Sequence, residues 1–350
     1  MSLTVLTVAY PFVPIGPDAV GGTEQVASAM DRAVVAAGHR SLVVACEGSQ
    51  VAGRLFPVPP CPPSLTRKLM RQQHGRMRKA IAAAQAAEPV DVIHMHGIDF
   101  AEYLPPPGPP LLATFHLPSY WYPEHAVRLD RCRSWLQCVS ARQQREMTQR
   151  SAWPHEQLLP FIANGVPLDG FARPRQPGDY ALMLTRICVE KGVHDALDAA
   201  AAAGVPLLLA GEVSAHKIHK DYFTQEVEPR LGPHACFLGP VGLRRKAELL
   251  AGARCLLVPS TAEETSSLVC MEAAAAGTPV VAYGCGALPE TVEHGRTGLL
   301  VDNCDEMAAA IARVGEIDPE TCRATARARF DVRRMTTLTL DRYRALVRLG

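Results

Sequence analysis

The sequence lacks a long apolar run and an excess of charge of either sign. No charge-free hydrophobic stretch approaches the roughly 20 residues that a membrane-spanning helix needs, and the mean hydropathy is +0.02. Lysine and arginine total 36 against 35 aspartate and glutamate, a formal net charge of +1. The sequence therefore argues against an integral membrane protein and against a globally basic nucleic-acid-binding protein.

Motifs for metals, disulfides and secretion are also missing. The 11 cysteines are scattered without a C-x-x-C pair, and no Cys/His cluster has the spacing of metal ligands. We therefore expect no metal site, and reduced thiols that lie mostly in the core. The amino terminus lacks the charged segment of a signal peptide, so we expect a cytoplasmic protein.

What the sequence does contain is an alternation of short apolar runs with longer, Ala-rich stretches. The runs predict strands at 3–9, 41–46, 90–95, 111–115, 136–139, 158–161, 181–185, 206–210, 235–238, 255–259, 279–282 and 298–301. The intervening stretches predict helices at 22–37, 65–87, 141–150, 193–203, 244–252, 267–276 and 305–314. Apolar runs without alternation are typical of parallel sheets buried on both faces by helices.

The two series of strands and helices predict two doubly wound, Rossmann-like α/β domains. A length of 350 residues also favours two domains. The boundary is predicted between Asn164 and Asp179, where Pro167, Pro174 and Pro177 interrupt a polar stretch. A final helix over 332–348 either caps the second domain or crosses back to the first.

A glycine-rich turn follows the first predicted strand. Gly16, Gly21 and Gly22 precede Thr23 and Glu24, which begin a helix. Glycines at this place allow backbone N–H groups to approach an anion at the helix amino end. A flexible turn with a helix cap is the alternative, and this turn alone does not decide between the two.

The segment from Val258 to Val281 has the highest density of candidate functional residues. Glu263 and Glu264 lie in a polar loop, and Glu272 lies inside the apolar helix that follows. A buried carboxylate needs a partner, which sugar hydroxyls or a nearby arginine can supply. At the helix start, the N–H groups of three residues can meet a phosphate: Ser266, Ser267 and Leu268.

This segment resembles the E-x7-E signature of the retaining GT-B glycosyltransferases of family GT4 (glycosyltransferase group 1). Glu264 and Glu272 match the two glutamates. Further matching motifs are Gly21-Gly22-Thr23-Glu24, Gly38-His39, Asp91-Val-Ile-His-Met-His96, Asn164-Gly-Val166, Arg186 with Lys191-Gly192, and Ala276-Gly-Thr-Pro-Val-Val281. Two departures are Thr265-Ser266-Ser267 in place of Gly-Phe-Gly, and Thr185 in place of a glycine.

The resemblance implies a GT-B fold and an enzyme that transfers a sugar with retention of configuration. Residues 1–165 would bind the acceptor, 166–331 the nucleotide sugar, and 332–350 would form the final helix. The donor would be a nucleoside diphosphate sugar, with UDP favoured and GDP or ADP as alternatives, and no cofactor or metal would be needed. A small molecule, a glycan or a lipid-linked compound would offer the acceptor hydroxyl.

The resemblance also implies roles for individual residues. Arg186 and Lys191 would bind the diphosphate together with the residues from Ser266 to Leu268. Glu272 would bind the ribose and Glu264 the transferred sugar. The remaining assignments are backbone contacts of Val241 with the base, donor contacts of Gly21 and Gly22, and orientation of the donor sugar by His116. His96 lines the acceptor side or, like His94, serves a structural role.

Two other classes of function stay open at this point. One is an epimerase or a phosphorylase on the same twin-domain fold, although a phosphorylase would need a lysine for pyridoxal phosphate and a longer chain. The other is a nucleotide-sugar-binding protein without catalytic activity. The complete set of Arg186, Lys191, Glu264 and Glu272 favours an enzyme over such a degenerate relative.

The segment from Ser64 to Ala87 carries six basic residues between Arg67 and Lys79 and no acidic one there. Leu65, Leu69, Met77 and Ile81 can form one apolar stripe of a helix. Three interpretations follow: a solvated basic face whose stripe packs on the first domain, a contact with an anionic acceptor, or a peripheral contact with anionic lipid.

Overall fold

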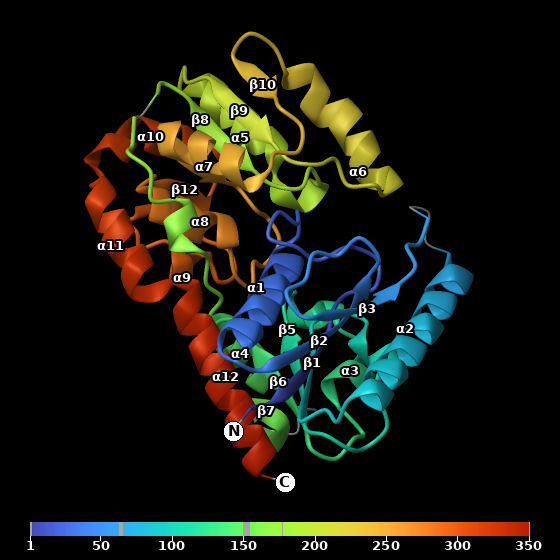
Figure 1. Ribbon diagram of the computed structural model, residues 1–350. Coiled ribbons are helices and arrows are strands. Elements are labelled where there is room, and N and C mark those ends of the chain that lie inside the picture. Colours follow the sequence, from blue (N-terminus) through green and yellow to red (C-terminus); the bar gives the residue numbers. More distant parts are fainter. Residues whose placement is uncertain (1, 63–65, 150–154, 177, 350) are drawn as a thin grey trace. The chain divides into compact units, whose positions relative to one another are not determined.

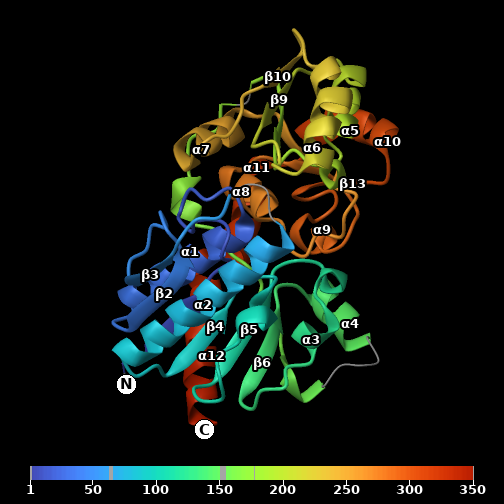
Figure 2. The same cartoon turned by 90° about the vertical axis from the view of Figure 1, so that its right-hand side faces the viewer.

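A computed structural model describes residues 2–62, 66–149, 155–176 and 178–349. Ser64, Leu65, Arg150 and Pro177, which enter the predictions above, lie outside these ranges. Backbone contacts divide the chain into unit 1, Met1–Asn164 with Arg333–Gly350, and unit 2, Gly165–Val332. Within each unit, helices cover a central sheet (Figures 1 and 2).

Unit 1 is built on a parallel sheet with the strand order β3-β2-β1-β4-β5-β6-β7. Its strands are β1 (Thr4–Val8), β2 (Arg40–Cys46), β3 (Arg54–Val58), β4 (Val92–Met95), β5 (Leu111–Phe115), β6 (Ser134–Cys138) and β7 (Leu158–Leu159). Its helices are α1 (Gly22–Ala36), α2 (Arg67–Ala87), α3 (Glu124–Val127), α4 (Ala141–Gln149) and α12 (Val332–Arg348).

Successive residues of β2 point into two different cores. Leu42 and Val44 pack with Met77 of α2, whereas Val43 and Ala45 pack in a separate cluster with Ala27 of α1. Because side chains alternate along a strand, helices on both sides can be packed only if every position is apolar. The absence of polar alternation in the sequence is thereby explained.

Unit 2 repeats this plan with the parallel strand order β10-β9-β8-β11-β12-β13. Its strands are β8 (Ala181–Leu184), β9 (Leu207–Ala210), β10 (Ala235–Phe237), β11 (Cys255–Val258), β12 (Val280–Tyr283) and β13 (Gly298–Val301). Its helices are α5 (Val193–Ala202), α6 (Lys217–Tyr222), α7 (Leu243–Gly252), α8 (Leu268–Ala276), α9 (Leu288–Thr291), α10 (Cys304–Arg313) and α11 (Pro319–Arg329).

The two faces of this second sheet are also buried separately. Met183 and Leu257 pack with α5 and α10, and Leu182 and Leu256 pack with α7, α8 and α11. The predicted fold class, an α/β protein with two doubly wound Rossmann-like sheets of the GT-B type, is confirmed.

The sequence did not predict β3, and the strand that it predicted at 158–161 is longer than β7. The strand β3 is five residues long, contains Pro57 and lies at the sheet edge, where a residue without an N–H group is tolerated. The predicted strand at 158–161 ends at Leu159, because Pro160 cannot donate to the ladder. The N–H group of Phe161 instead donates to Gln144 Oε1, at 2.7 Å.

Four helices were also not predicted from the sequence: α3, α6, α9 and α11. Three of these are six residues long or shorter, which is too short for a helical period to emerge. The helix α11 is mostly polar, but it did carry a start signal. Asp318 caps it by accepting hydrogen bonds from the N–H groups of Glu320 and Thr321, and Pro319 is its first residue.

The final helix α12 packs within unit 1. The hydroxyl of its buried Tyr343 is hydrogen-bonded to Nδ1 of His94, at 2.6 Å. The guanidinium of Arg342 donates to Oε1 of Gln137 in β6, at 2.8 Å. These contacts tie the last part of unit 1 to strands formed more than 200 residues earlier in the chain.

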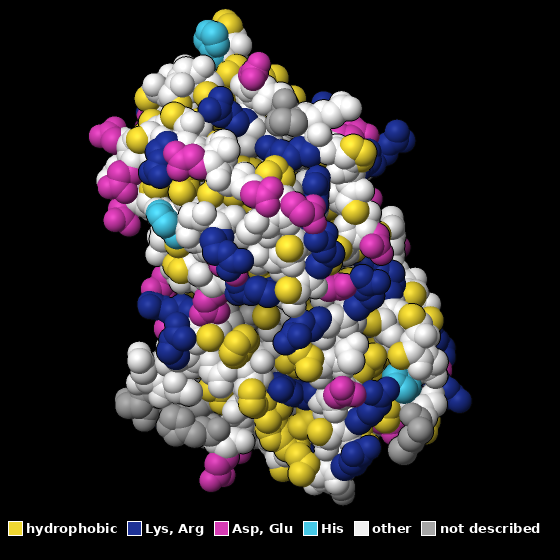
Figure 3. All heavy atoms as spheres, turned by 90° about the vertical axis from the view of Figure 1, so that its left-hand side faces the viewer, with side chains coloured by type: hydrophobic (Ala, Val, Ile, Leu, Met, Phe, Trp, Pro, Cys, Tyr) yellow, Lys and Arg dark blue, Asp and Glu magenta, His cyan; other side chains and the backbone are white. Residues whose placement is uncertain are grey.

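The surface reflects the balanced composition. On the face drawn in Figure 3, basic and acidic side chains are interspersed. Over the described residues, none of the helices combines the length and the apolar character needed to cross a bilayer. Six of the eleven free cysteines are buried, and Cys132 and Cys236 are exposed.

The segment Pro105–Pro110, a connector that leads into β5, is held by one buried side chain. Arg131, which is 5% exposed, donates to the carbonyl oxygens of Pro105 and Pro106 at 3.1 Å and of Pro109 at 2.9 Å. Five of the six connector residues are prolines, which have no N–H groups to form a ladder. The guanidinium thus provides the donors that these carbonyls would otherwise lack.

We expect Arg131→Met to destabilise unit 1 by about 2–4 kcal/mol, because it removes the donor of one buried and two partly buried hydrogen bonds to carbonyl groups. Urea unfolding of the intact chain measures this change. Arg128→Met is the matched control, since Arg128 is an exposed arginine of the same segment, 3.6 Å from Glu124. An Arg131 variant as stable as the Arg128 variant would contradict the assigned role.

Candidate functional site

The predicted donor residues of unit 2 follow two neighbouring parallel strands. Arg186 and Lys191 follow β8, and Glu264 and Ser266 follow β11, which pairs with β8. Because the carboxyl ends of parallel strands share one edge of a sheet, these two loops lie together. This edge is the usual ligand-binding place in open α/β sheets.

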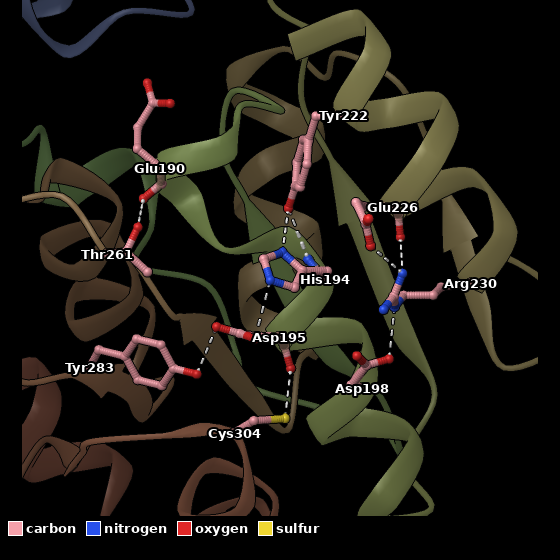
Figure 4. Close-up of polar contacts among 10 residues, drawn as sticks. All are labelled: Glu190, His194, Asp195, Asp198, Tyr222, Glu226, Arg230, Thr261, Tyr283 and Cys304. Atoms are coloured by element: carbon pink, nitrogen blue, oxygen red, sulfur yellow. Dashed lines mark hydrogen bonds and ion pairs between the residues drawn. The ribbon is translucent and has the colours of Figure 1, made fainter. Parts of the chain in front are cut away.

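One carbonyl group accepts several hydrogen bonds that connect the two loops. The carbonyl oxygen of Glu190 accepts hydrogen bonds from the N–H group of Thr261 at 2.9 Å and from its hydroxyl at 3.2 Å (Figure 4). The hydroxyl of Ser260 lies 3.3 Å from the same oxygen. Glu190 directly precedes Lys191, so these bonds fix the lysine backbone against the loop that carries the glutamates.

Two glycines allow close approaches of backbone at this edge. At Gly192, φ is +61° and a Cβ atom would lie 2.2 Å from the carbonyl oxygen of Pro259, so another residue there would push apart the loops after β8 and β11. At Gly286, in the loop after β12, φ is +58° and a Cβ atom would lie 2.5 Å from the backbone N and O atoms of Glu264. Any other residue there would push the loop after β12 away from Glu264, and at both positions it would strain the backbone.

The structure brings Lys191 and Glu264 together in an ion pair. The side chains are 23% and 15% exposed. Partial burial strengthens such a pair relative to one on the surface. The pair presents one cation and one carboxylate at the same point of the sheet edge, near the amino end of α8.

Arg186 and the start of α8 supply further positive character at this edge. Arg186 is exposed, and no ion pair joins it to another described residue. Ser267 is the amino-cap residue of α8, yet no described side chain caps this helix. The first N–H groups of α8, including that of Leu268, therefore have neither an intrahelical partner nor a side-chain cap. Ser266 Oγ is buried without a hydrogen-bond partner among the described residues.

Glu272 lies one turn further along α8 and forms an ion pair with Lys246 of α7. The two side chains are only 3% and 15% exposed. Burial raises the pKa of the Glu272 carboxyl, and the neighbouring ammonium of Lys246 acts in the opposite direction. The partner of this carboxylate within the protein is thus a lysine and not an arginine. Val241, the predicted base contact, is half-buried and lies two residues before α7.

The amino end of α5 differs from that of α8 because a side chain covers it. The hydroxyl of Tyr222 accepts a hydrogen bond from the N–H group of His194 at 3.1 Å and lies 2.8 Å from Nδ1 of the same residue (Figure 4). Asp195 is held by the hydroxyl of Tyr283, at 2.9 Å. Of these two helix amino ends, that of α8 is the better anion-binding position.

The predicted glycines of unit 1 lie at the start of α1. Gly21 is its amino-cap residue and Gly22 its first residue. The carboxylate of Glu24 lies over Gly21, so that a Cβ atom there would be 1.8 Å from Glu24 Oε2. A side chain at position 21 would displace this carboxylate, which is favourably placed at the positive end of the helix. The donor role of Gly21 and Gly22 stays a prediction.

The predicted histidines of unit 1 form a buried row. His96 Nδ1 lies 3.0 Å from His116 Nε2, and His94 Nε2 lies 2.7 Å from Thr114 Oγ1. The N–H group of His116 donates to the hydroxyl of Tyr122, at 3.0 Å. His96 Nε2 is buried without a partner among the described residues. His94 is tied into the fold on both ring nitrogens, in agreement with a structural role.

Burial also changes the protonation of this row. It lowers the pKa of His94 to about 3 and that of His116 to about 4, and it lowers the pKa of His96 well below the usual range. All three rings are therefore neutral near pH 7. The shared hydrogen bond of His96 and His116 then needs one ring nitrogen as donor and the other as acceptor.

The six basic residues of α2 are all exposed: Arg67, Lys68, Arg71, Arg76, Arg78 and Lys79. Met77 and Ile81 are buried in the core of unit 1, and Leu69 is half-buried. The described part of the apolar stripe therefore packs largely into the protein, and the basic residues of α2 meet solvent.

Sequence reasoning missed Lys246, Gly286 and Tyr222. A signal for Lys246 did exist, since it lies three and four positions before the buried Leu249 and Leu250 on the same face of α7. Gly286 and Tyr222 gave no such signal, because their contacts depend on segments distant in the chain. Among the described residues, no group of three or more His, Cys, Asp and Glu side chains is arranged to hold a metal ion.

We expect unit 1 to lose stability as the pH falls from 6.5 towards 4. The unfolded histidines take up protons in this range while the buried ones stay neutral, so stability is complete above pH 6.5 and decreases below it. The slope is about 1.4 kcal/mol per pH unit for each such histidine. Urea unfolding at several pH values measures it.

His116→Gln should reduce this slope, and His125→Gln should not, because His125 is exposed. An unchanged slope in the His116 variant, or equal stability at pH 6.5 and pH 4.5, would contradict the neutral buried row.

Comparison with known proteins supports the family and the fold. The family model of the glycosyl transferases group 1 matches residues 178–316, and that of glycosyltransferase family 4 matches residues 20–169. A D-inositol 3-phosphate glycosyltransferase of Streptomyces scabiei is 33% identical over 167 residues, which cover 47% of this chain and 34% of the relative. The match thus spans about a third of that relative's length.

Solved structures share the fold of the whole chain. A sucrose-phosphate synthase from Thermosynechococcus elongatus is 21% identical, with a TM-score of 0.82 over 99% of this chain and 100% of that one. Anabaena HepE in complex with UDP and glucose is 19% identical, with a TM-score of 0.75 over 98% and 100% of the two chains. These likenesses show the fold, and the two family models, which follow one another along most of the sequence, show the family: the chain belongs to the group 1 glycosyltransferases of family 4.

Proposed function

We propose that this protein transfers a sugar from a nucleoside diphosphate sugar to an acceptor hydroxyl, with retention of configuration and without a metal ion. The observation that carries the proposal is the ion pair of Lys191 and Glu264 beside the uncapped amino end of α8. A cation and free N–H groups suit a diphosphate, and a carboxylate suits sugar hydroxyls.

In the proposed complex, Arg186, Lys191 and the first N–H groups of α8 bind the diphosphate. Glu264 accepts hydrogen bonds from the transferred sugar, and Glu272 accepts them from the ribose. The backbone at Val241 contacts the base. His116, neutral near pH 7, orients the donor sugar, and Gly21 and Gly22 allow a close approach of the backbone to the donor.

The proposed chemistry depends on stabilising the leaving diphosphate. Its negative charge grows as the bond to the anomeric carbon breaks, and Arg186 and Lys191 stabilise that charge more than the charge of the bound donor. A short-lived oxocarbenium ion pair forms, and the diphosphate accepts the proton of the attacking hydroxyl on the same face. These cationic groups supply the positive charge that a metal ion provides elsewhere.

We propose UDP as the preferred nucleotide, because the structurally similar HepE was solved with UDP and with UDP-glucose. The relatives named D-inositol 3-phosphate glycosyltransferases suggest an acceptor that carries a phosphate. The exposed basic face of α2 is the candidate contact for such an anionic acceptor. A contact of this face with anionic lipid is the alternative.

We expect Lys191→Ala and Arg186→Ala to lower kcat about 100-fold or more, with a smaller effect on donor affinity, because the diphosphate charge is greatest in the transition state. Turnover of the best donor in a panel of UDP-, GDP- and ADP-sugars measures this. Lys217→Ala is the matched control, since Lys217 is 85% exposed and pairs only with Asp221 of its own helix. A kcat within about threefold of that control would remove the proposed role.

We further expect the product to keep the anomeric configuration of the donor when the reaction runs in EDTA. The anomeric proton of the product, followed by NMR, reports the configuration directly. An inverted product, or activity lost in EDTA and restored by a divalent metal, would refute this part of the proposal. Formation of an isomerised donor would indicate an epimerase instead.

A further inference from the structure

Lys246 and Glu272 form the more deeply buried of the two lysine–glutamate pairs in unit 2. The Lys246 side chain is 15% exposed and that of Glu272 is 3% exposed. The Lys246 ammonium also lies 5.6 Å from the ring centroid of Phe171, a residue with no exposed surface. An ammonium that interacts with both a carboxylate and an aromatic face is restricted in position.

The neighbours of Lys246 in sequence do not share this environment. Arg244 and Arg245, 87% and 59% exposed, pair with Glu248 on the outer side of α7. Only the third of these consecutive cations lies on the face that packs against α8. Lys246 is therefore buried because its position in the helical repeat places its side chain on the inner face of α7.

The titratable and charged groups around Glu272 come from three helices and from the loop before α8. Lys246 is the facing cation from α7. From α11, Arg323 donates to the carbonyl oxygens of Ala276 and Arg173. On α8 itself, Cys270 is buried, and burial raises the pKa of its thiol to about 12, so that it stays neutral. In the preceding loop, Glu264 is paired with Lys191.

We propose that Lys246 is a positioning residue that keeps Glu272 ionised and oriented, so that this carboxylate can accept the ribose hydroxyls of the donor nucleotide. The inference rests on the proposed function and adds a residue to it. Lys246 engages Oε1 of Glu272, and no hydrogen bond to Oε2 is made within the described part of the chain. Oε2 is thus the acceptor left for the ligand.

The need for the lysine follows from burial. A carboxylate without a cation in this position would take up a proton at a higher pH than it does beside Lys246, since burial alone raises its pKa. A protonated carboxyl group accepts fewer hydrogen bonds and binds a cis-diol less well. Ribose binding therefore persists above the pKa of Glu272 and is lost as the pH falls through it. Because Lys246 acts to lower that pKa, its removal moves this loss to higher pH.

The test compares UDP with 2′-deoxy-UDP, which lacks one of the ribose hydroxyls, by calorimetry from pH 6 to pH 9. The variants are Lys246→Met, Lys246→Arg and the matched control Arg244→Met, which removes an exposed cation from the same helix. If GDP or ADP binds better than UDP, that nucleotide and its 2′-deoxy form are used.

We expect wild type and the Arg244 variant to prefer the ribonucleotide at every pH. Lys246→Met should bind it about tenfold or more weakly at pH 7, with little preference over the deoxy form, and should recover as the pH rises. Lys246→Arg should retain most of the preference. In a Glu272→Gln background, the further change Lys246→Met should have little effect on the ribose preference.

A Lys246→Met variant with the ribose preference and pH profile of wild type would overturn the inference, and the proposed function would stand. A variant equally weak at all pH values for both nucleotides would also overturn it, because a merely structural lysine gives that result. If wild type binds none of the three nucleoside diphosphates, the proposed function itself fails. Thermal unfolding of each variant shows whether it is folded.

Discussion

Burial of a carboxylate without a cation is strongly unfavourable, and the arrangement of unit 2 depends on meeting this constraint twice. Glu264 is held against Lys191, and Glu272 against Lys246. Each pair joins two segments distant in the chain, so the ion pairs also determine how α7, α8 and the loop after β8 lie relative to one another. The same charged groups are the ones that we propose to bind the donor at this sheet edge.

The parallel sheet brings these groups together at one edge. Individual backbone and side-chain contacts then decide which of them are left accessible. The carbonyl group of Glu190 and the glycine at 192 bring the loops after β8 and β11 into contact, and the glycine at 286 lets the loop after β12 approach Glu264. Tyr222 covers the amino end of α5, whereas no described side chain caps α8. Of two helix amino ends that look equivalent in a topology diagram, one is thereby covered and the other is left for an anion.

Unit 1, by contrast, has buried histidines at the ends of two strands, β4 and β5. Its histidines are buried and neutral, and they are connected by hydrogen bonds that reach from β4 to the final helix α12. A neutral imidazole can orient a hydroxyl without adding charge to the site. The positive charge proposed for catalysis is then contributed by the cations of unit 2.

The sequence by itself determined the fold class, most strand and helix positions and the family, because continuous apolar runs and short motifs are local properties of the chain. It also identified Glu264, Glu272 and Lys191 as candidates. Only the tertiary structure decided that Lys246 pairs with Glu272, that Gly286 makes room for Glu264 and that Arg131 holds the proline connector. These partners are separated by about 20 residues or more along the chain, and only the packing of the sheet and its helices brings them into contact.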